Sequence, residues 1–230
     1  MLRWLAFGLA LAACESAPMS LPEGPEAPRS PHTREQLSAA ADLQRAVVEG
    51  RLADARAGGA LLSEMPAVHT PAQRIAEADD LAAAGVALGQ VGQACGRCHA
   101  TSGVHAALDP GPAPAAGSSL ASQMKRHAWG ATRLWQGVSG PDDRAWAEGS
   151  ATIADTPIDI AQAMHDKPNV EAFELAEQLH DQAQRAGSSR DLGGRANLYG
   201  EVMATCASCH RIMRPQPVIH SDRENVARSR

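Results

Sequence analysis

The residues of this chain that can do chemistry are concentrated in a five-residue pattern, C-x-x-C-H, that occurs twice. The first copy covers residues 95–99 and the second covers residues 206–210. Two thiols at this spacing lie about one helical turn apart and can form thioethers with the two vinyl groups of one haem, while the adjacent histidine binds the iron. The sequence therefore predicts two covalently bound haem c groups. The residues expected to hold them are Cys95, Cys98, His99, Cys206, Cys209 and His210.

Two other chemistries also use paired cysteines. A structural zinc site needs four ligands from paired motifs. A redox dithiol of the thioredoxin type is expected beside a βαβ pattern. Neither explains why a histidine stands at the same place in both copies, so haem attachment is the favoured interpretation.

The residues before the two motifs repeat along with them, which indicates a duplicated unit. Apolar and cysteine side chains recur at one helical spacing in both copies, namely Leu81, Leu88, Val91, Cys95 and Cys98, and Leu192, Tyr199, Val202, Cys206 and Cys209. This pattern predicts an amphipathic helix that carries its cysteines on the buried face. Asp80 and Asp191 stand where the N-caps of the two helices are expected.

Further helices are predicted upstream of each motif. The chain is 44% hydrophobic but only 3% aromatic, and it is rich in alanine, the best helix former. The helices are expected at residues 34–50, 52–65 and 71–78 in the first unit, and at 120–137, 141–155 and 169–186 in the second. The predicted fold class is therefore all-α, with two tandem four-helix bundles that each carry C-x-x-C-H on the last helix.

The expected organisation follows from these units. Haem domain 1 is predicted at residues 34–107 and haem domain 2 at 119–214, with a Pro/Gly/Ser linker at 108–118 between them. A basic tail is expected at 215–230.

The N-terminal segment has the features of an export signal. Residues 1–13 contain one arginine followed by a short apolar stretch, as in a signal peptide. The sequence Leu-Ala-Ala-Cys that ends at Cys14 resembles the bacterial lipobox, which implies cleavage before Cys14 and attachment of a lipid to its sulfur. Residues 14–33 contain five prolines and are predicted to form an extended tether. The protein is thus expected on the periplasmic side, anchored to the inner or outer membrane.

The position of the motif on the last helix of a four-helix unit resembles the class II cytochromes c, the cytochrome c-prime type. This resemblance implies that Cys95, Cys98, Cys206 and Cys209 carry thioethers and that His99 and His210 are proximal ligands. It also implies that the distal side of each haem faces the first helix of its bundle. In the second unit that helix offers His127 as the first candidate for a distal ligand and Met124 as the alternative.

The first unit departs from this pattern. Aligning Gly50 with Gly137 places Leu37 and Ala40 at the matching positions, and aligning Ala55 with Ala145 places Arg34 and Leu37 there. Neither register provides a ligand, so the first haem is expected to be five-coordinate. The remaining candidates lie in or beside predicted loops or the tether, and they are His32, Met65, His69 and His105.

The favoured function is electron transfer. The net charge of −5 arises from mixed charges, which argues against nucleic-acid binding. Two haems in tandem predict a carrier of single electrons between a membrane-bound donor and a redox acceptor protein, among respiratory or photosynthetic partners of the bacterial cell envelope, and not an enzyme. The alternatives are binding of NO or CO at an open first haem, or peroxidase-like chemistry, which would need a distal acid–base residue.

Overall fold

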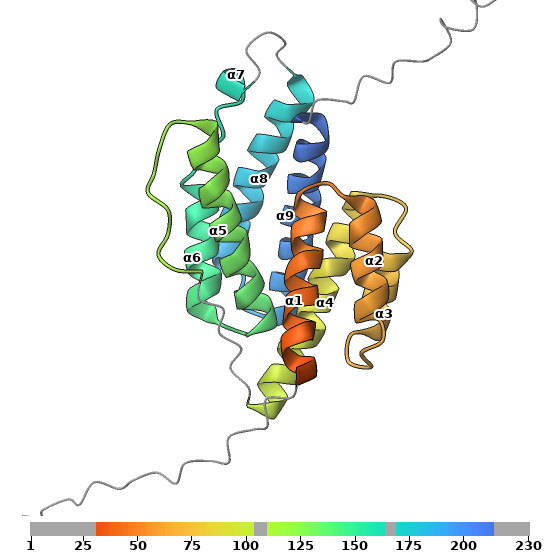
Figure 1. Ribbon diagram of the computed structural model, residues 1–230. Helices are drawn as coiled ribbons and strands as arrows, with labels where there is room; N and C mark the ends of the chain where they lie inside the picture. Colours follow the sequence, from red (N-terminus) through yellow and green to blue (C-terminus); the bar gives the residue numbers. More distant parts are fainter. Residues whose placement is uncertain (1–30, 104–109, 164–168, 214–230) are drawn as a thin grey trace, which may run out of the picture.

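The computed structural model describes residues 31–103, 110–163 and 169–213, with the side chains of 31–37, 162 and 163 excepted. All secondary structure in these ranges is helical, which confirms the predicted all-α class (Figure 1). The first half contains α1 (Pro31–Val48), α2 (Leu52–Leu62), α3 (His69–Ala76) and α4 (Leu81–Ser102). The second half contains α5 (Leu120–Ser139), α6 (Asp143–Ala154), α7 (Ile160–Ala163), α8 (Val170–Ser188) and α9 (Leu192–Met213). The signal peptide, Cys14, most of the tether and the basic tail lie outside the described residues.

The two helices that carry the motifs begin as the repeat predicts. Asp80 accepts a hydrogen bond from the Ala83 backbone N–H at 2.8 Å, and Asp191 accepts one from Gly194 at the same distance. Both helices then run for 22 residues. Identical caps and lengths place the two motifs at the same depth along α4 and α9.

Some predicted boundaries are wrong. The tether was expected to reach residue 33, but α1 begins at Pro31. Proline is tolerated in the first turn of a helix, where its missing N–H would have no intrahelical partner. The single turn of α7 was not predicted, because four residues are too few for a periodic pattern.

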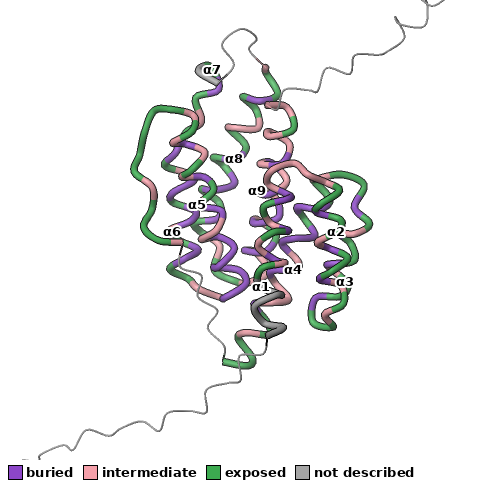
Figure 2. Tube along the Cα trace, in the orientation of Figure 1, coloured by how far each residue is buried: buried purple, intermediate pink, exposed green. Residues whose placement is uncertain are grey.

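The two halves share one hydrophobic core. Among the described helices, α4 and α9 make the most extensive contact, and each also packs against the first helix of the opposite half. Buried residues of both halves therefore form one cluster, which includes Leu43, Leu88, Leu134, Tyr199 and Met203. Buried segments follow the interior of both halves in Figure 2. The halves are thus joined through the helices that carry the motifs.

Small residues allow α4 and α9 to approach closely. A Cβ atom added to Gly89 would lie 2.2 Å from the carbonyl oxygen of Ala196, and one added to Gly85 would lie 2.7 Å from the nitrogen of Ala204. Gly200, which matches Gly89 in the repeat, likewise faces the backbone of Val86 at 3.0 Å. The duplicated helix therefore packs in an antiparallel manner against its own copy, as in the two-fold interface of a homodimer.

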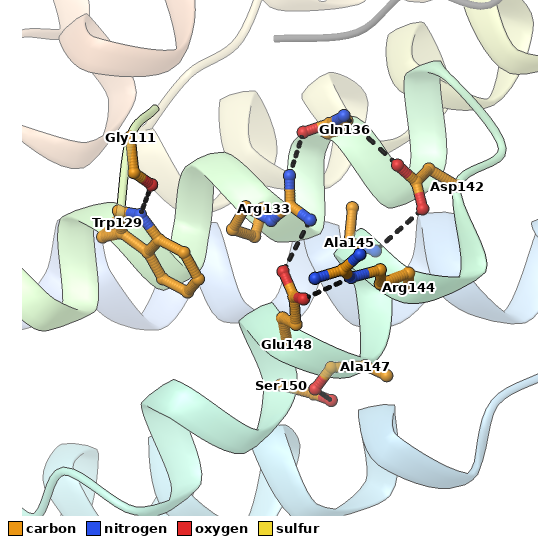
Figure 3. Close-up of polar contacts among 10 residues, drawn as sticks. All are labelled: Gly111, Trp129, Arg133, Gln136, Asp142, Arg144, Ala145, Ala147, Glu148 and Ser150. Carbon is orange, nitrogen blue, oxygen red and sulfur yellow. Dashed lines mark hydrogen bonds and ion pairs between the residues drawn. The ribbon is translucent and has the colours of Figure 1, made fainter. Parts of the chain in front are cut away.

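A polar network fixes the outer side of the α5–α6 pair (Figure 3). Arg133 donates to Glu148 at 2.6 Å, and Glu148 also accepts from Arg144 at 2.7 Å. Trp129 donates its indole N–H to the carbonyl of Gly111 at 3.0 Å, which holds the linker against α5. These contacts position α5, the helix that carries Met124 and His127.

Glu148→Gln tests this network. Hydrogen bonds from Arg144 and Arg133 hold the pKa of Glu148 below its usual value. Because the Arg133 side chain is only 12% exposed, we expect the variant to lose about 1 kcal/mol of unfolding free energy at pH 7.

The carboxylate of Glu148 stabilises the fold above its unfolded pKa of about 4.3, and this contribution is lost as the pH falls through the lower folded value. Urea denaturation should therefore show a smaller loss of stability between about pH 5 and pH 3 in the variant than in wild type. Exposed Glu64→Gln is the control and should leave both quantities unchanged.

Candidate functional site

The second motif faces a cavity between α5, α8 and α9. Cys206, Cys209 and His210 line one side of the cavity, and Met124 and His127 lie among its other lining residues. The remaining walls are apolar and are formed by Val48, Ala128, Ala131, Ile158 and Leu179. The structure thus places the predicted attachment residues and both predicted distal candidates around a single cavity of about 70 Å³.

Both motif histidines are oriented in the same way. Nδ1 of His99 lies 2.7 Å from the carbonyl oxygen of Ser139, and Nδ1 of His210 contacts the carbonyl oxygen of Val48. A carbonyl oxygen only accepts, so Nδ1 carries the proton in both rings. In the neutral ring Nε2 is then the nitrogen without a hydrogen, and among the described residues it has no hydrogen-bond partner in either histidine. Histidines that bind metals are held in this manner, with the second ring N–H donated to a carbonyl or carboxylate.

These two hydrogen bonds cross between the halves. Ser139 is the last residue of α5 and orients the histidine of the first half, whereas Val48 is the last residue of α1 and orients the histidine of the second half. Each motif therefore depends on the opposite half for its orientation. Sequence reasoning missed both carbonyls, because a backbone acceptor carries no residue-type signal.

The thiols of Cys95 and Cys206 are not activated as nucleophiles. Burial, with a smaller contribution from the neighbouring Cys98, raises the pKa of Cys95 to about 11. Burial in the same way raises the pKa of Cys206 to about 12. Reactive dithiols have lowered thiol pKa values, so a thioredoxin-type role is disfavoured. The described cysteines form no disulfide with one another.

His127 has a polar partner in this structure. Its side chain is 8% exposed, and its Nε2 donates to the carbonyl oxygen of Thr156 at 2.6 Å. Burial lowers the pKa of His127, which keeps the ring neutral at pH 7. Thr156 is itself held by a hydrogen bond from its hydroxyl to the carbonyl of Thr152 at 2.7 Å. Binding iron through Nε2 would require this contact to break, whereas no such contact holds Met124.

The first motif is less enclosed than the second. Cys95 is half-buried against the shared core, while Cys98 is exposed. The prediction that both cysteines lie on the buried face of this helix is therefore wrong for Cys98, because no helix of the described residues covers that side of the last turns of α4. Of the four distal candidates in this half, Met65 is half-buried against the core and His69 is exposed, with its Nδ1 donating to the carbonyl of Ser63 at 2.6 Å. The side chains of His32 and His105 lie outside the described residues.

Packing between the first two helices of each half defines the register of the repeat. A Cβ atom on Gly58 would meet Leu43, and one on Gly149 would meet Leu134. Gly58 matches Gly149 and Leu43 matches Leu134 at one and the same offset. This offset differs from those of the Gly50–Gly137 and Ala55–Ala145 alignments. This register places Thr33 and Gln36 at the positions of Met124 and His127. None of the three registers therefore places a histidine or methionine at these positions in the first half.

The donor set at each motif, together with the apolar walls described at the second, fits a covalently held haem. Paired cysteines on one helix face, a neighbouring histidine with Nε2 available and apolar walls are the groups that haem c requires. The cavity at the second motif is smaller than a porphyrin, so its apolar side chains must move aside to admit one.

Among the described residues there is no cluster of three or more His, Cys, Asp or Glu side chains placed to hold a metal ion, and no helix is long and apolar enough to cross a membrane.

Searches against protein-family models, curated proteins and solved structures find no match to this chain. The functional argument therefore depends on the motif residues and their surroundings.

Proposed function

We propose that this protein is a dihaem c-type cytochrome that carries single electrons between a membrane-bound donor and a redox acceptor protein in the bacterial cell envelope. The proposal includes attachment of the two groups at Cys95, Cys98, Cys206 and Cys209, with His99 and His210 as proximal ligands. It also includes export and a lipid anchor at Cys14. When haem is bound at each motif, its iron takes up or releases one electron.

The observation that carries the proposal is the matched state of the two motif histidines. Each Nδ1 is committed to a carbonyl of the opposite half, which leaves Nε2 as the nitrogen for iron. Two such sites on closely packed helices suit electron transfer, because a rigid surrounding limits rearrangement when the charge changes. Peroxidase-like chemistry would need a distal acid–base side chain, and at the second motif the candidate for it, His127, has its Nε2 engaged by the carbonyl oxygen of Thr156.

We further propose Met124, not His127, as the sixth ligand at the second motif. Met124 lines the cavity, and the Nε2 of His127 is already engaged by Thr156. In the protein with both groups attached, Met124→Leu should convert one haem from low spin to high spin, whereas His127→Gln should leave the spin state unchanged. Magnetic circular dichroism and electron paramagnetic resonance provide the measurement. A change of spin state in His127→Gln but not in Met124→Leu would instead identify His127 as the ligand.

Electron exchange is the direct test of the function. The full-length protein, matured with its haems, should be reduced by a quinol-oxidising membrane fraction and rapidly reoxidised by a terminal acceptor. Stopped-flow absorbance of the haem bands follows both steps. Protein that carries two haems but exchanges electrons only sluggishly with every partner would contradict the proposal.

A second function is favoured by one feature of the repeat. The packing register aligns Thr33 and Gln36, neither of which is a strong iron ligand, with Met124 and His127 in the sequence. An open iron at the first motif would bind NO or CO. A CO-difference spectrum with one haem equivalent of tight binding, together with slow electron exchange, would make gas binding the better assignment.

A further inference from the structure

An open groove runs along the outer side of α8 and α9 and reaches the first turns of α4. Its volume is about 660 Å³. We call it the acidic groove. Its walls are formed by Glu174, Leu175, Glu177, Gln178, Asp181, Gln182 and Arg185 of α8, by Glu201, Ala204, Thr205 and Ser208 of α9, and by Ala82 and Val86 of α4.

Negative charge dominates this groove. Its lining contains four carboxylates and a single guanidinium, and that guanidinium is used by the ion pair between Arg185 and Glu201 at 2.6 Å. The other three carboxylates, on Glu174, Glu177 and Asp181, are exposed and form no ion pair with any described residue. Like charges along one concave surface concentrate the electric field and attract cations into it.

Two lining residues of the groove, Val86 and Gln182, suit a protein ligand. Val86 is 50% exposed there, which is unusual for a large apolar side chain next to a shared core. Gln182 is only 2% exposed, and its Oε1 is buried without a hydrogen-bond partner among the described residues. A buried acceptor without a partner costs free energy that an entering donor would recover.

The acidic groove and the cavity of the second motif lie on opposite sides of the same two helices. On α9, Thr205 and Ser208 line the groove, whereas Cys206 and Cys209 line the cavity. On α8, Gln182 faces the groove and Leu179 faces the cavity. A protein seated in the groove is therefore separated from the second motif by a single layer of helices.

We propose that the acidic groove is the docking site of a basic redox protein, which inserts lysine or arginine side chains between α8 and α9, and that electrons pass through the second motif. This inference rests on the proposed function and adds to it the chemistry of the partner and the point of contact. Complementary charge accelerates such encounters and selects partners, and the attraction weakens as salt rises.

The test uses the full-length protein with its haems and an octalysine peptide as the probe. Isothermal titration and ¹⁵N NMR should show binding at about 20 mM salt, with shift changes on α8 and α9, and much weaker binding at about 200 mM salt. The variant Glu174→Lys/Glu177→Lys/Asp181→Lys should lower the affinity about tenfold or more. The haems of this triple variant should also be reduced more slowly by the hexaammineruthenium(II) cation.

The matched control is Glu64→Lys/Glu77→Lys/Asp79→Lys, which makes the same change in net charge at exposed residues of the first half. This control should retain peptide affinity within about twofold. Equal loss of affinity in both triple variants would overturn the proposal, because net charge alone would then explain binding. Stronger peptide binding after removal of residues 214–230 would also overturn it, because the chain's own basic tail would then be the occupant.

Peptide binding is measured independently of electron exchange. A protein that binds the peptide in the groove but lacks haem would therefore contradict only the proposed function. A protein that exchanges electrons but does not bind the peptide would contradict only the docking site.

Discussion

Each chain that matures in a host with haem-attachment machinery is expected to carry two haem masses, and replacing Cys206 and Cys209 by serine should remove one of them. The reason is that both cysteines line one cavity beside His210, so they are expected to hold the same group. Cys95→Ser/Cys98→Ser should remove the other. Intact mass spectrometry under denaturing conditions measures this directly, because thioether bonds survive unfolding.

Ser208→Ala is the control for this experiment. Ser208 stands between the two cysteines of the second motif but lines the outer groove instead of the cavity. The variant should keep both haem masses. Wild-type protein with a single haem mass, or with haem that acid acetone extracts, would contradict the assignment of both motifs.

The helices themselves follow from local sequence. Asp80 and Asp191 begin α4 and α9 as predicted, because a cap depends only on the next three residues. The pairing of Met124 and His127 with the second motif was also expected, and the two side chains do lie beside Cys206 in one cavity. The cap predictions succeed because they concern neighbours on one helix, whereas iron binding by Met124 or His127 stays a prediction.

The packing between the halves could not be read from the same patterns. Two tandem bundles were expected, yet α4 and α9 lie against each other and share one core. A signal was present in the repeat, because Gly89 and Gly200 occupy the same position in the middle of two otherwise regular helices. A glycine there costs about 1 kcal/mol relative to alanine, so a close backbone contact is its physical explanation.

The carbonyls that orient the motif histidines could not be predicted from the sequence either. Val48 and Ser139 are different residue types, and only their positions at the ends of α1 and α5 are alike. What matters is a free carbonyl in the last turn of a helix, where no intrahelical partner remains. Such groups are supplied by any residue, so only the folded arrangement identifies them.

The Gly89→Ala variant should lose at least about 2 kcal/mol of unfolding free energy. The added methyl group would lie 2.2 Å from the carbonyl oxygen of Ala196 and 3.1 Å from the nitrogen of Gly200. Both atoms belong to the backbone of α9, so no side-chain rotation can relieve the overlap. Chemical denaturation followed by far-UV circular dichroism measures the loss.

Gly187→Ala is the matched control, because Gly187 is also helical but its nearest atom to an added Cβ is the Ser150 hydroxyl oxygen at 3.8 Å. Alanine is the better helix former, so this variant should keep its stability or gain up to about 1 kcal/mol. Equal stability of the two variants would show that α4 and α9 are not in close contact at Gly89.

We expect the crossing of α4 and α9 to couple the two sites to one another. When Gly89→Ala pushes the helices apart, both motifs move relative to the opposite half, and the contacts of His99 with Ser139 and of His210 with Val48 are strained together. Hydrogen bonds to the second nitrogen of a ligand histidine tune its basicity. Spectra of both haems should therefore change in this variant, although the substitution touches neither motif. A change confined to one haem would mean that the two sites are oriented independently.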